Sequence, residues 1–172
     1  MEAPVEIALI NQELSSIDEH QILVHLSLDS DSTEDANTKE ILDKCEVLNL
    51  HCNKLSSLEG LTMSLNFLTD LNLSSNNFSI CDLPELAFLP ALQRLDLSGN
   101  KLTSLFELPF MPGLKSLFAA HNFIRSVYRI DENVPSLEIL DIRGNEISKW
   151  EDLVRYYYLL LLHMLIVWYS VV

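Results

Sequence analysis

The chain has 172 residues, of which 25 are acidic and 11 are basic, so its formal net charge at pH 7 is −14. This balance argues against nucleic acid as a partner, because proteins hold phosphate backbones through Lys and Arg. Hydrophobic residues make up 48% of the chain, enough to bury a core and too many for a disordered acidic tail. With 4 Gly and 3 Cys, the composition also disfavours a glycine-cradled phosphate site and a dense disulfide framework.

Two weaker segments open the chain before its regular repeats begin. We interpret residues 1–22 as an N-terminal cap, with Gln12 in the position that an asparagine takes in the later repeats. Residues 23–31, LVHLSLDSD, are interpreted as a degenerate repeat with Asp31 in that position. Residues 29–40, DSDSTEDANTKE, hold no aromatic or large apolar side chain and are predicted to form an acidic, solvated insertion.

A pattern of leucines around one asparagine, L-x-x-L-x-L-x-x-N-x-L, then recurs five times. The copies read CEVLNLHCNKL (45–55), LTDLNLSSNNF (68–78), LQRLDLSGNKL (92–102), LKSLFAAHNFI (114–124) and LEILDIRGNEI (137–147). Their asparagines form a predicted structural ladder of Asn53, Asn76, Asn100, Asn122 and Asn145, spaced by 23, 24, 22 and 23 residues. Such a period is typical of solenoids, in which each repeat is one structural unit.

The L-x-L part of each copy predicts a short strand whose alternate residues point inward. Strands of successive copies are expected to pair in parallel, so that their leucines form one continuous core. The asparagine falls where the chain must turn, and its buried amide can satisfy backbone groups that the turn leaves unpaired. No copy can bury its apolar side alone, so the stability of each depends on its neighbours.

The segments between the strands are short and hold apolar residues at turn-like spacing. Across the repeats, which we place at 23–150, we expect short helical or 3₁₀ turns rather than long helices. Pro90, Pro112 and Pro135 each precede the first leucine of the next copy by two residues. Proline at this point ends any short helix and fixes the backbone ahead of the strand.

These copies resemble the leucine-rich-repeat family, in its short intracellular class of about 22 residues per repeat, over roughly residues 5–150. The resemblance implies an α/β leucine-rich-repeat solenoid with a parallel concave sheet and short convex helical or 3₁₀ turns. It also implies a non-catalytic module or scaffold that binds protein partners on the concave face. A regulatory subunit of protein phosphatase 1 typifies the class, so phosphatase regulation is one implied function.

A second resemblance rests on the stretches INQELSSI, LVHLSLDS and VLNLHCNKLSSLEGL. They are similar to the N-terminal repeats of leucine-rich-repeat and coiled-coil centrosomal proteins. This likeness implies an adaptor associated with the cytoskeleton or centrosome.

Residues that point away from the core on the predicted strands form columns across the concave face. We expect them to bind the partner around Phe118, because an exposed aromatic among polar residues is a typical hot-spot anchor. Asp96 and Asp141 share its column, where their charge would select the partner. Alternatively, Phe118 folds over Ala119 and Ala120 and only covers thin core. The predicted binding residues are Asn49, Asp70, Asn72, Arg94, Asp96, Phe118, Ile139, Asp141 and Arg143.

The sequence predicts no catalytic, metal or cofactor site. The five histidines are scattered, and no two have the i, i+4 spacing of a helical metal site. Cys45 takes the place of a core leucine, and an odd number of cysteines without a pairing pattern fits a reducing compartment. The N-terminus has no basic region ahead of its apolar residues, which argues against a secretory signal. We therefore expect a cytoplasmic protein that is not an enzyme.

The last segment, residues 151–172, is apolar and leaves three interpretations open. It is a damaged last repeat with Val167 in the ladder position, a membrane anchor formed by residues 156–172, or a product of truncation or alternative splicing. As a helix the 17 residues of the anchor would span about 26 Å, short of a hydrocarbon core of about 30 Å. The anchor would make the chain a membrane-associated adaptor with its repeats in the cytosol. An exposed apolar tail would also promote self-association.

Overall fold

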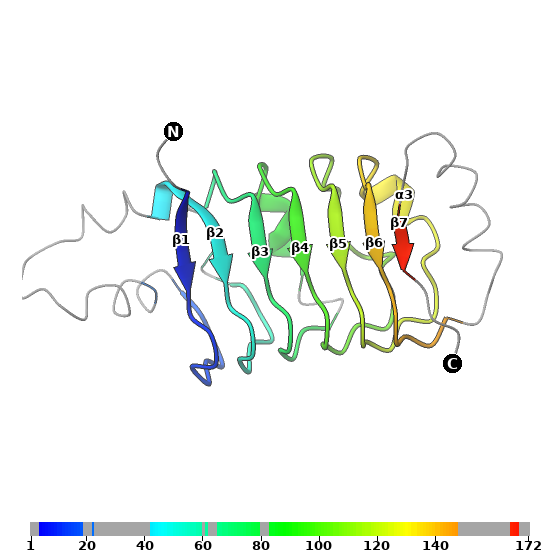
Figure 1. Cartoon of the computed structure of the whole chain (residues 1–172), viewed down its shortest axis with the longest axis horizontal. Helices are drawn as coiled ribbons and strands as arrows, with labels where there is room; N and C mark the ends of the chain where they lie inside the picture. The colour runs from blue at the N-terminus through cyan, green and yellow to red at the C-terminus, as the bar shows by residue number, and fades with distance from the viewer. Residues whose placement is uncertain are drawn as a thin grey trace, which may run out of the picture.

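The computed structural model describes residues 4–18, 22, 42–59, 61, 65–79, 83–147 and 166–168. In this part of the chain, successive coils place their strands side by side in one parallel sheet, in chain order (Figure 1). The strands are β1 (Val5–Ala8), β2 (Cys45–Asn49), β3 (Asp70–Asn72), β4 (Arg94–Asp96), β5 (Ser116–Phe118), β6 (Ile139–Asp141) and β7 (Ile166–Trp168). The expected solenoid with a parallel sheet is therefore confirmed.

The strands pair so that equivalent residues of successive coils lie next to each other. The central leucines Leu48, Leu71, Leu95, Leu117 and Leu140 are neighbours in the sheet, and all are buried. They belong to one apolar core that runs from Ile7 to Ile142. Cys45 is fully buried in this core, and its burial raises the pKa of the thiol to about 11. It packs as the small core residue that the pattern predicts.

The ladder asparagines join each coil to the coil before it. Asn100 shows the arrangement: its Oδ1 accepts a hydrogen bond from the backbone N–H of Phe78 at 3.0 Å, in the preceding coil. Its Nδ2 donates to the carbonyl of Leu73 in the preceding coil at 2.9 Å and to that of Leu97 in its own coil at 3.0 Å. The other ladder asparagines Asn53, Asn76, Asn122 and Asn145 make the equivalent bonds.

The residue just before each ladder position has a left-handed backbone. These residues have φ between 55° and 68° and are Asn11, Cys52, Ser75, Gly99, His121 and Gly144. Glycine reaches this conformation without steric cost, whereas other residues are strained by it. At Gly144 a Cβ would also lie 2.6 Å from Nδ1 of His121, so any other residue here would have to displace the His121 ring as well as adopt the strained backbone. The sequence signal was the glycine in SGN and RGN.

The convex side carries the short turns that the sequence predicts. A 3₁₀ helix, η3 (Pro84–Phe88), follows β3, and a single helical turn, α3 (Ile130–Asn133), follows β5. Ahead of β4, the N–H of Leu92 bonds the carbonyl of Leu89 across Pro90, and the same turn encloses Pro112 and Pro135. Proline takes the second position of these turns, where its fixed φ suits the backbone.

The N-terminal coil differs from the expected order of repeats. β1 pairs directly with β2, with Ile7 opposite Leu48, so no strand lies between them. The interpretation of residues 23–31 as a repeat stacked between the cap and the first regular copy is therefore wrong. These residues and the acidic insertion 29–40 lie outside the described residues. Gln12 does take the ladder position, because Oδ1 of Asn53 accepts from the N–H of Leu14, two residues after Gln12, at 3.1 Å, as Oδ1 of Asn100 accepts from that of Phe78, two residues after Asn76.

At the other end, β7 extends the sheet beyond the five regular copies. Val167 pairs with Leu140, which places it in the strand and not in the ladder position that the sequence suggested. The repeat pattern proposed for the tail is therefore out of register. The other tail residues lie outside the described part of the chain. Among the helices in that part, none has the length and apolar character needed to cross a membrane.

We predict that Asn76→Ala lowers the free energy of unfolding by about 2–3 kcal/mol, because it leaves buried backbone groups of two coils without a hydrogen-bond partner. Asn76 accepts from the N–H of Leu55 and donates to the carbonyls of Leu50 and Leu73. Urea denaturation followed by circular dichroism measures the change.

The matched control is Asn77→Ala, one residue further on and outside the ladder, where we expect a change below about 0.5 kcal/mol. Equal effects of the two substitutions would contradict the ladder.

Candidate functional site

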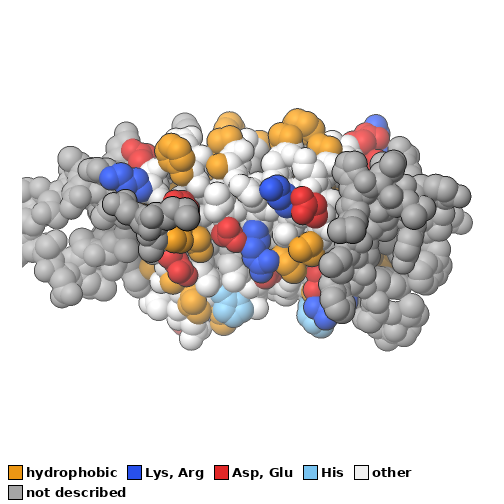
Figure 2. Space-filling view, turned by 45° about the horizontal axis from the view of Figure 1, so that its top comes forward, with side chains coloured by type: hydrophobic (Ala, Val, Ile, Leu, Met, Phe, Trp, Pro, Cys, Tyr) orange, Lys and Arg blue, Asp and Glu red, His pale blue; other side chains and the backbone are white. Residues whose placement is uncertain are grey.

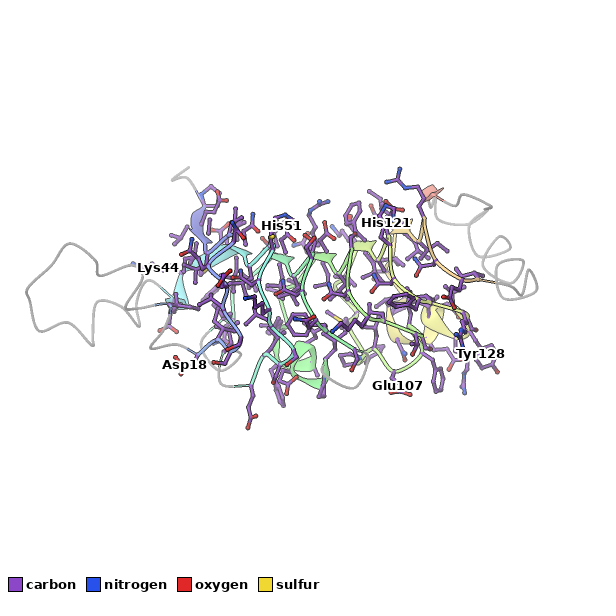
Figure 3. The ribbon with its side chains drawn as sticks, turned by 90° about the horizontal axis from the view of Figure 1, so that it is seen from below. Asp18, Lys44, His51, Glu107, His121 and Tyr128 are labelled. Carbon is purple, nitrogen blue, oxygen red and sulfur yellow. The ribbon has the colours of Figure 1, made fainter. Side chains whose placement is uncertain are left out.

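The candidate site is the concave face, defined as the side chains of β1 to β6 that point away from the core. In register, its first column holds Val47, Asp70, Arg94, Ser116 and Ile139, and its second holds Asn49, Asn72, Asp96, Phe118 and Asp141. Figure 3 shows His51 and His121 on the side of the sheet and Glu107 and Tyr128 on the opposite, convex side. The structure thus brings the predicted binding residues of the strands onto one surface.

A shallow depression of about 180 Å³ lies over β2, β3 and β4. Its polar lining is Asn49, Asp70, Asn72, Arg94 and Asp96, all predicted binding residues, and its base includes Leu48 and Leu71. Basic, acidic and hydrophobic side chains lie close together near the middle of the surface in Figure 2. The sequence suggested a binding site centred on Phe118. The depression instead lies beside β5, over the three preceding strands.

Polar residues of the second column accept backbone hydrogen bonds at the ends of the strands. Asn49 Oδ1 accepts from the N–H of His51 at 3.1 Å, and Asn72 Oδ1 accepts from that of Ser74 at 2.9 Å. Asp96 Oδ1 bonds the N–H of Ser98 in the same way at 2.9 Å. A side-chain oxygen two residues before the donor mimics a backbone turn. Each of these residues therefore has a structural role as well as an exposed polar surface.

Phe118 is the residue of this column that has no oxygen to accept such a bond. Its ring is half-buried rather than exposed, because the guanidinium of Arg94 lies over it at 4.1 Å from the ring centroid. Arg94 Nε in turn lies 3.6 Å from Oδ1 of Asp70. Asp70 and Arg94 thus lie directly opposite each other on β3 and β4, and Arg94 reaches diagonally to Phe118 on β5. The sequence predicted an exposed ring or one folded over Ala119 and Ala120, and the columns did not show that a long cation could reach the ring.

Asp141 differs from the free surface charge that the sequence predicts. It is 5% exposed, and the Arg143 guanidinium donates two hydrogen bonds to it, from Nε to Oδ1 at 2.9 Å and from Nη2 to Oδ2 at 2.6 Å. Burial by itself raises the pKa of this carboxyl. The hydrogen bonds from the Arg143 side chain and N–H, together with its charge, outweigh burial and leave the pKa below the ordinary value. The two residues neutralise each other, and their i, i+2 spacing on one strand face was the sequence signal.

A hydrogen-bonded group at the end of β3 was missed by the sequence analysis. Ser74 Oγ donates to Oδ1 of Asn72 at 2.6 Å and lies 2.7 Å from Nδ1 of His51. Because Asn72 takes the hydroxyl proton, His51 donates Nδ1–H to Ser74, and the serine is not poised as a nucleophile. His51 and Ser74 are neighbours in the third column, which was the available signal. In the described part of the chain, no cluster of three or more His, Cys, Asp or Glu residues could hold a metal ion.

The convex side exposes a second group of aromatic residues that the sequence analysis did not single out. They are Phe88, Phe106, Phe110 and Tyr128, each between 46% and 63% exposed. The rings of Phe106 and Tyr128 are 6.3 Å apart between centroids. Phe106 and Tyr128 both lie six residues after a ladder asparagine, so their contact follows from the repeat.

Comparison with known proteins finds leucine-rich repeats in part of the chain. Residues 43–102 match the family model described as leucine rich repeat. Over 109 residues the chain is 36% identical to an uncharacterised leucine-rich-repeat-containing protein of Schizosaccharomyces pombe. That match covers 60% of this chain and 17% of the yeast protein, so the chain spans about one sixth of its relative.

Solved structures show the same fold. A leucine-rich-repeat protein of Leptospira interrogans is similar with a TM-score of 0.61 and 27% identity, over 78% of this chain and 34% of that one. An internalin of Listeria monocytogenes is similar with a TM-score of 0.63 and 20% identity, over 89% of this chain and 49% of that one. The fold is that of a leucine-rich-repeat solenoid.

We predict that Asp141→Asn lowers the free energy of unfolding at pH 7 by about 1–3 kcal/mol, because the charge-assisted bonds to Arg143 are lost. Since the folded pKa of Asp141 is lowered, its contribution is complete above the unfolded value of about 3.9. It is lost as pH falls through the folded pKa. The gap between variant and wild type in urea denaturation should therefore close at acid pH.

Asp96→Asn serves as the control, because this aspartate lies in the same column and has no ion pair within the described residues. A gap for Asp141→Asn that stays constant with pH would contradict the role given to Arg143.

Proposed function

We propose that this leucine-rich-repeat chain is a non-catalytic docking module that binds a protein partner on its concave face, between β2 and β6. Solenoids expose extended concave surfaces of this kind, and such surfaces serve protein recognition. The depression over β2 to β4 and the ring of Phe118 on β5 are adjacent on that surface. Together they offer a partner both a polar hollow and an apolar contact.

Phe118 carries this proposal. Asn49, Asn72 and Asp96 in the same column each accept a strand-end hydrogen bond, and a phenylalanine forgoes it. A half-buried aromatic ring next to a cation is a suitable anchor, because it adds contact area with few side-chain rotors to immobilise. The substitution of an aromatic for a turn-forming residue is best accounted for by recognition of a partner.

The narrower functions remain proposals that rest on resemblance. A phosphatase regulator would use aromatic and acidic residues of the concave face, and Phe118, Asp70 and Asp96 supply them here. An adaptor at the cytoskeleton or centrosome would use the same face. We also propose a cytoplasmic location, because an odd number of cysteines without a pairing pattern fits a reducing compartment. Because the match spans 17% of the yeast relative, partners of any larger protein are also proposals.

The tail is proposed to close the solenoid rather than to enter a membrane. This is supported by the pairing of β7 with β6, in which Ile166, Val167 and Trp168 lie opposite Ile139, Leu140 and Asp141. A backbone that is bonded to the sheet in this way cannot at the same time span a bilayer as a helix. The alternative roles of the tail are a membrane anchor and a surface for self-association.

We predict that Phe118→Asn removes the partner while the fold survives. Asparagine can accept the N–H of Ala120, as Asn72 does for Ser74, so the free energy of unfolding should change by less than about 1 kcal/mol. Quantitative mass spectrometry of affinity-purified protein would compare the proteins retained by wild type and variant.

The matched control is Phe110→Asn, which changes a 63% exposed ring on the convex side and should leave the retained proteins unchanged. Identical retained proteins for wild type and Phe118→Asn would contradict docking at this ring, and a large loss of stability would instead support the core-covering alternative.

We also predict that deletion of residues 153–172 lowers the free energy of unfolding, because it removes β7 and exposes the edge of β6. Both forms should stay in the supernatant when lysates with membranes are centrifuged. If only the full chain sediments, and detergent releases it, the tail is an anchor.

A further inference from the structure

The charged side chains at the concave face differ in whether they have a partner within the described part of the chain. Arg94 on β4 lies between Asp70 and the ring of Phe118, and Arg143, two residues after the end of β6, is paired with Asp141. Asp96, in contrast, accepts one backbone hydrogen bond and has no ion pair within the described residues. The depression therefore contains two carboxylates and one guanidinium that is turned toward its neighbours. Among the described residues, one of these two carboxylates has no ion pair, so the depression carries a negative charge there.

The two halves of the face differ in chemistry. Toward β4 the second column presents Asn49, Asn72 and Asp96, whose oxygens line the depression. On β5 and β6 the half-buried apolar side chains of Phe118 and Ile139 follow. Strands are about 4.8 Å apart, so the centre of the depression on β3 lies about 10–14 Å from these apolar residues. One helical segment of two turns covers that distance.

We propose that the partner is a segment, helical in its bound form, that places a basic side chain in the depression and a large apolar side chain, two turns away, on Phe118 and Ile139. The proposal rests on the proposed docking function and adds the chemistry of the partner. The net charge of −14 attracts such a segment at long range. An acidic segment would instead face Asp70 and Asp96, and Arg94, the cation that lines the depression, already lies against Asp70 and Phe118.

The test uses a display library of random helical peptides selected on the full chain. We expect enriched peptides to carry Lys or Arg two turns from a large apolar residue, and to bind more weakly as salt is raised. Asp96→Asn should weaken their binding about fivefold. This variant keeps the strand-end hydrogen bond, because asparagine already makes it at Asn49 and Asn72. The matched control Glu59→Gln removes a charge in the segment between β2 and β3 and should have no effect.

The outcomes separate this proposal from the docking function. Peptides that are neutral or acidic, or that bind Asp96→Asn as tightly as wild type but fail to bind Phe118→Asn, overturn the basic partner and leave docking on the concave face intact. Peptides that bind Phe118→Asn and Asp96→Asn as tightly as wild type overturn both. Both proposals are also overturned if the selection on wild type enriches no peptide above the level obtained with Phe118→Asn.

Discussion

The fold depends on the hydrogen bonds between asparagine side chains and the backbone of two successive coils. Each ladder amide accepts from a backbone N–H of the coil before it and donates to carbonyls of that coil and its own, as Asn100 does with Phe78, Leu73 and Leu97. These groups are buried in the turn, where water cannot replace the missing partner. The amide therefore sets both the shape of the turn and the spacing of the coils. Through Asn53 the same interaction attaches the N-terminal coil.

The regular spacing has a consequence for the exposed surface. Because strands pair in register, one position of the repeat becomes one column of the concave face. A polar residue in the second column serves the fold through the strand-end hydrogen bond, whether or not it meets a partner. Polar composition on this face is therefore weak evidence for recognition. A residue that cannot make the bond, such as Phe118, is stronger evidence, because the fold forgoes the strand-end hydrogen bond at that position.

Several features of the structure could be predicted from the sequence. Other predictions were wrong, for reasons that particular residues show. The period of the asparagines predicted the parallel sheet, the buried leucines and the short convex turns. Two candidate strands preceded the first regular copy, and the sequence pattern placed a repeat at residues 23–31 between the cap and that copy. The structure selects Val5–Ala8. The contact of Arg94 with Phe118 was also missed, because a column pattern gives neighbours along one position and not diagonal contacts made by long side chains.

By itself, the sequence determined which residues face the core and which form the columns, because both follow from a period of two on each strand and a fixed repeat length. Tertiary structure alone decided which of the exposed groups are available. Asp141 and Asp96 occupy the same column, yet one is buried against Arg143 and the other has no ion pair within the described residues. Position in a repeat fixes the direction of a side chain, whereas its free charge depends on which neighbours reach it in space.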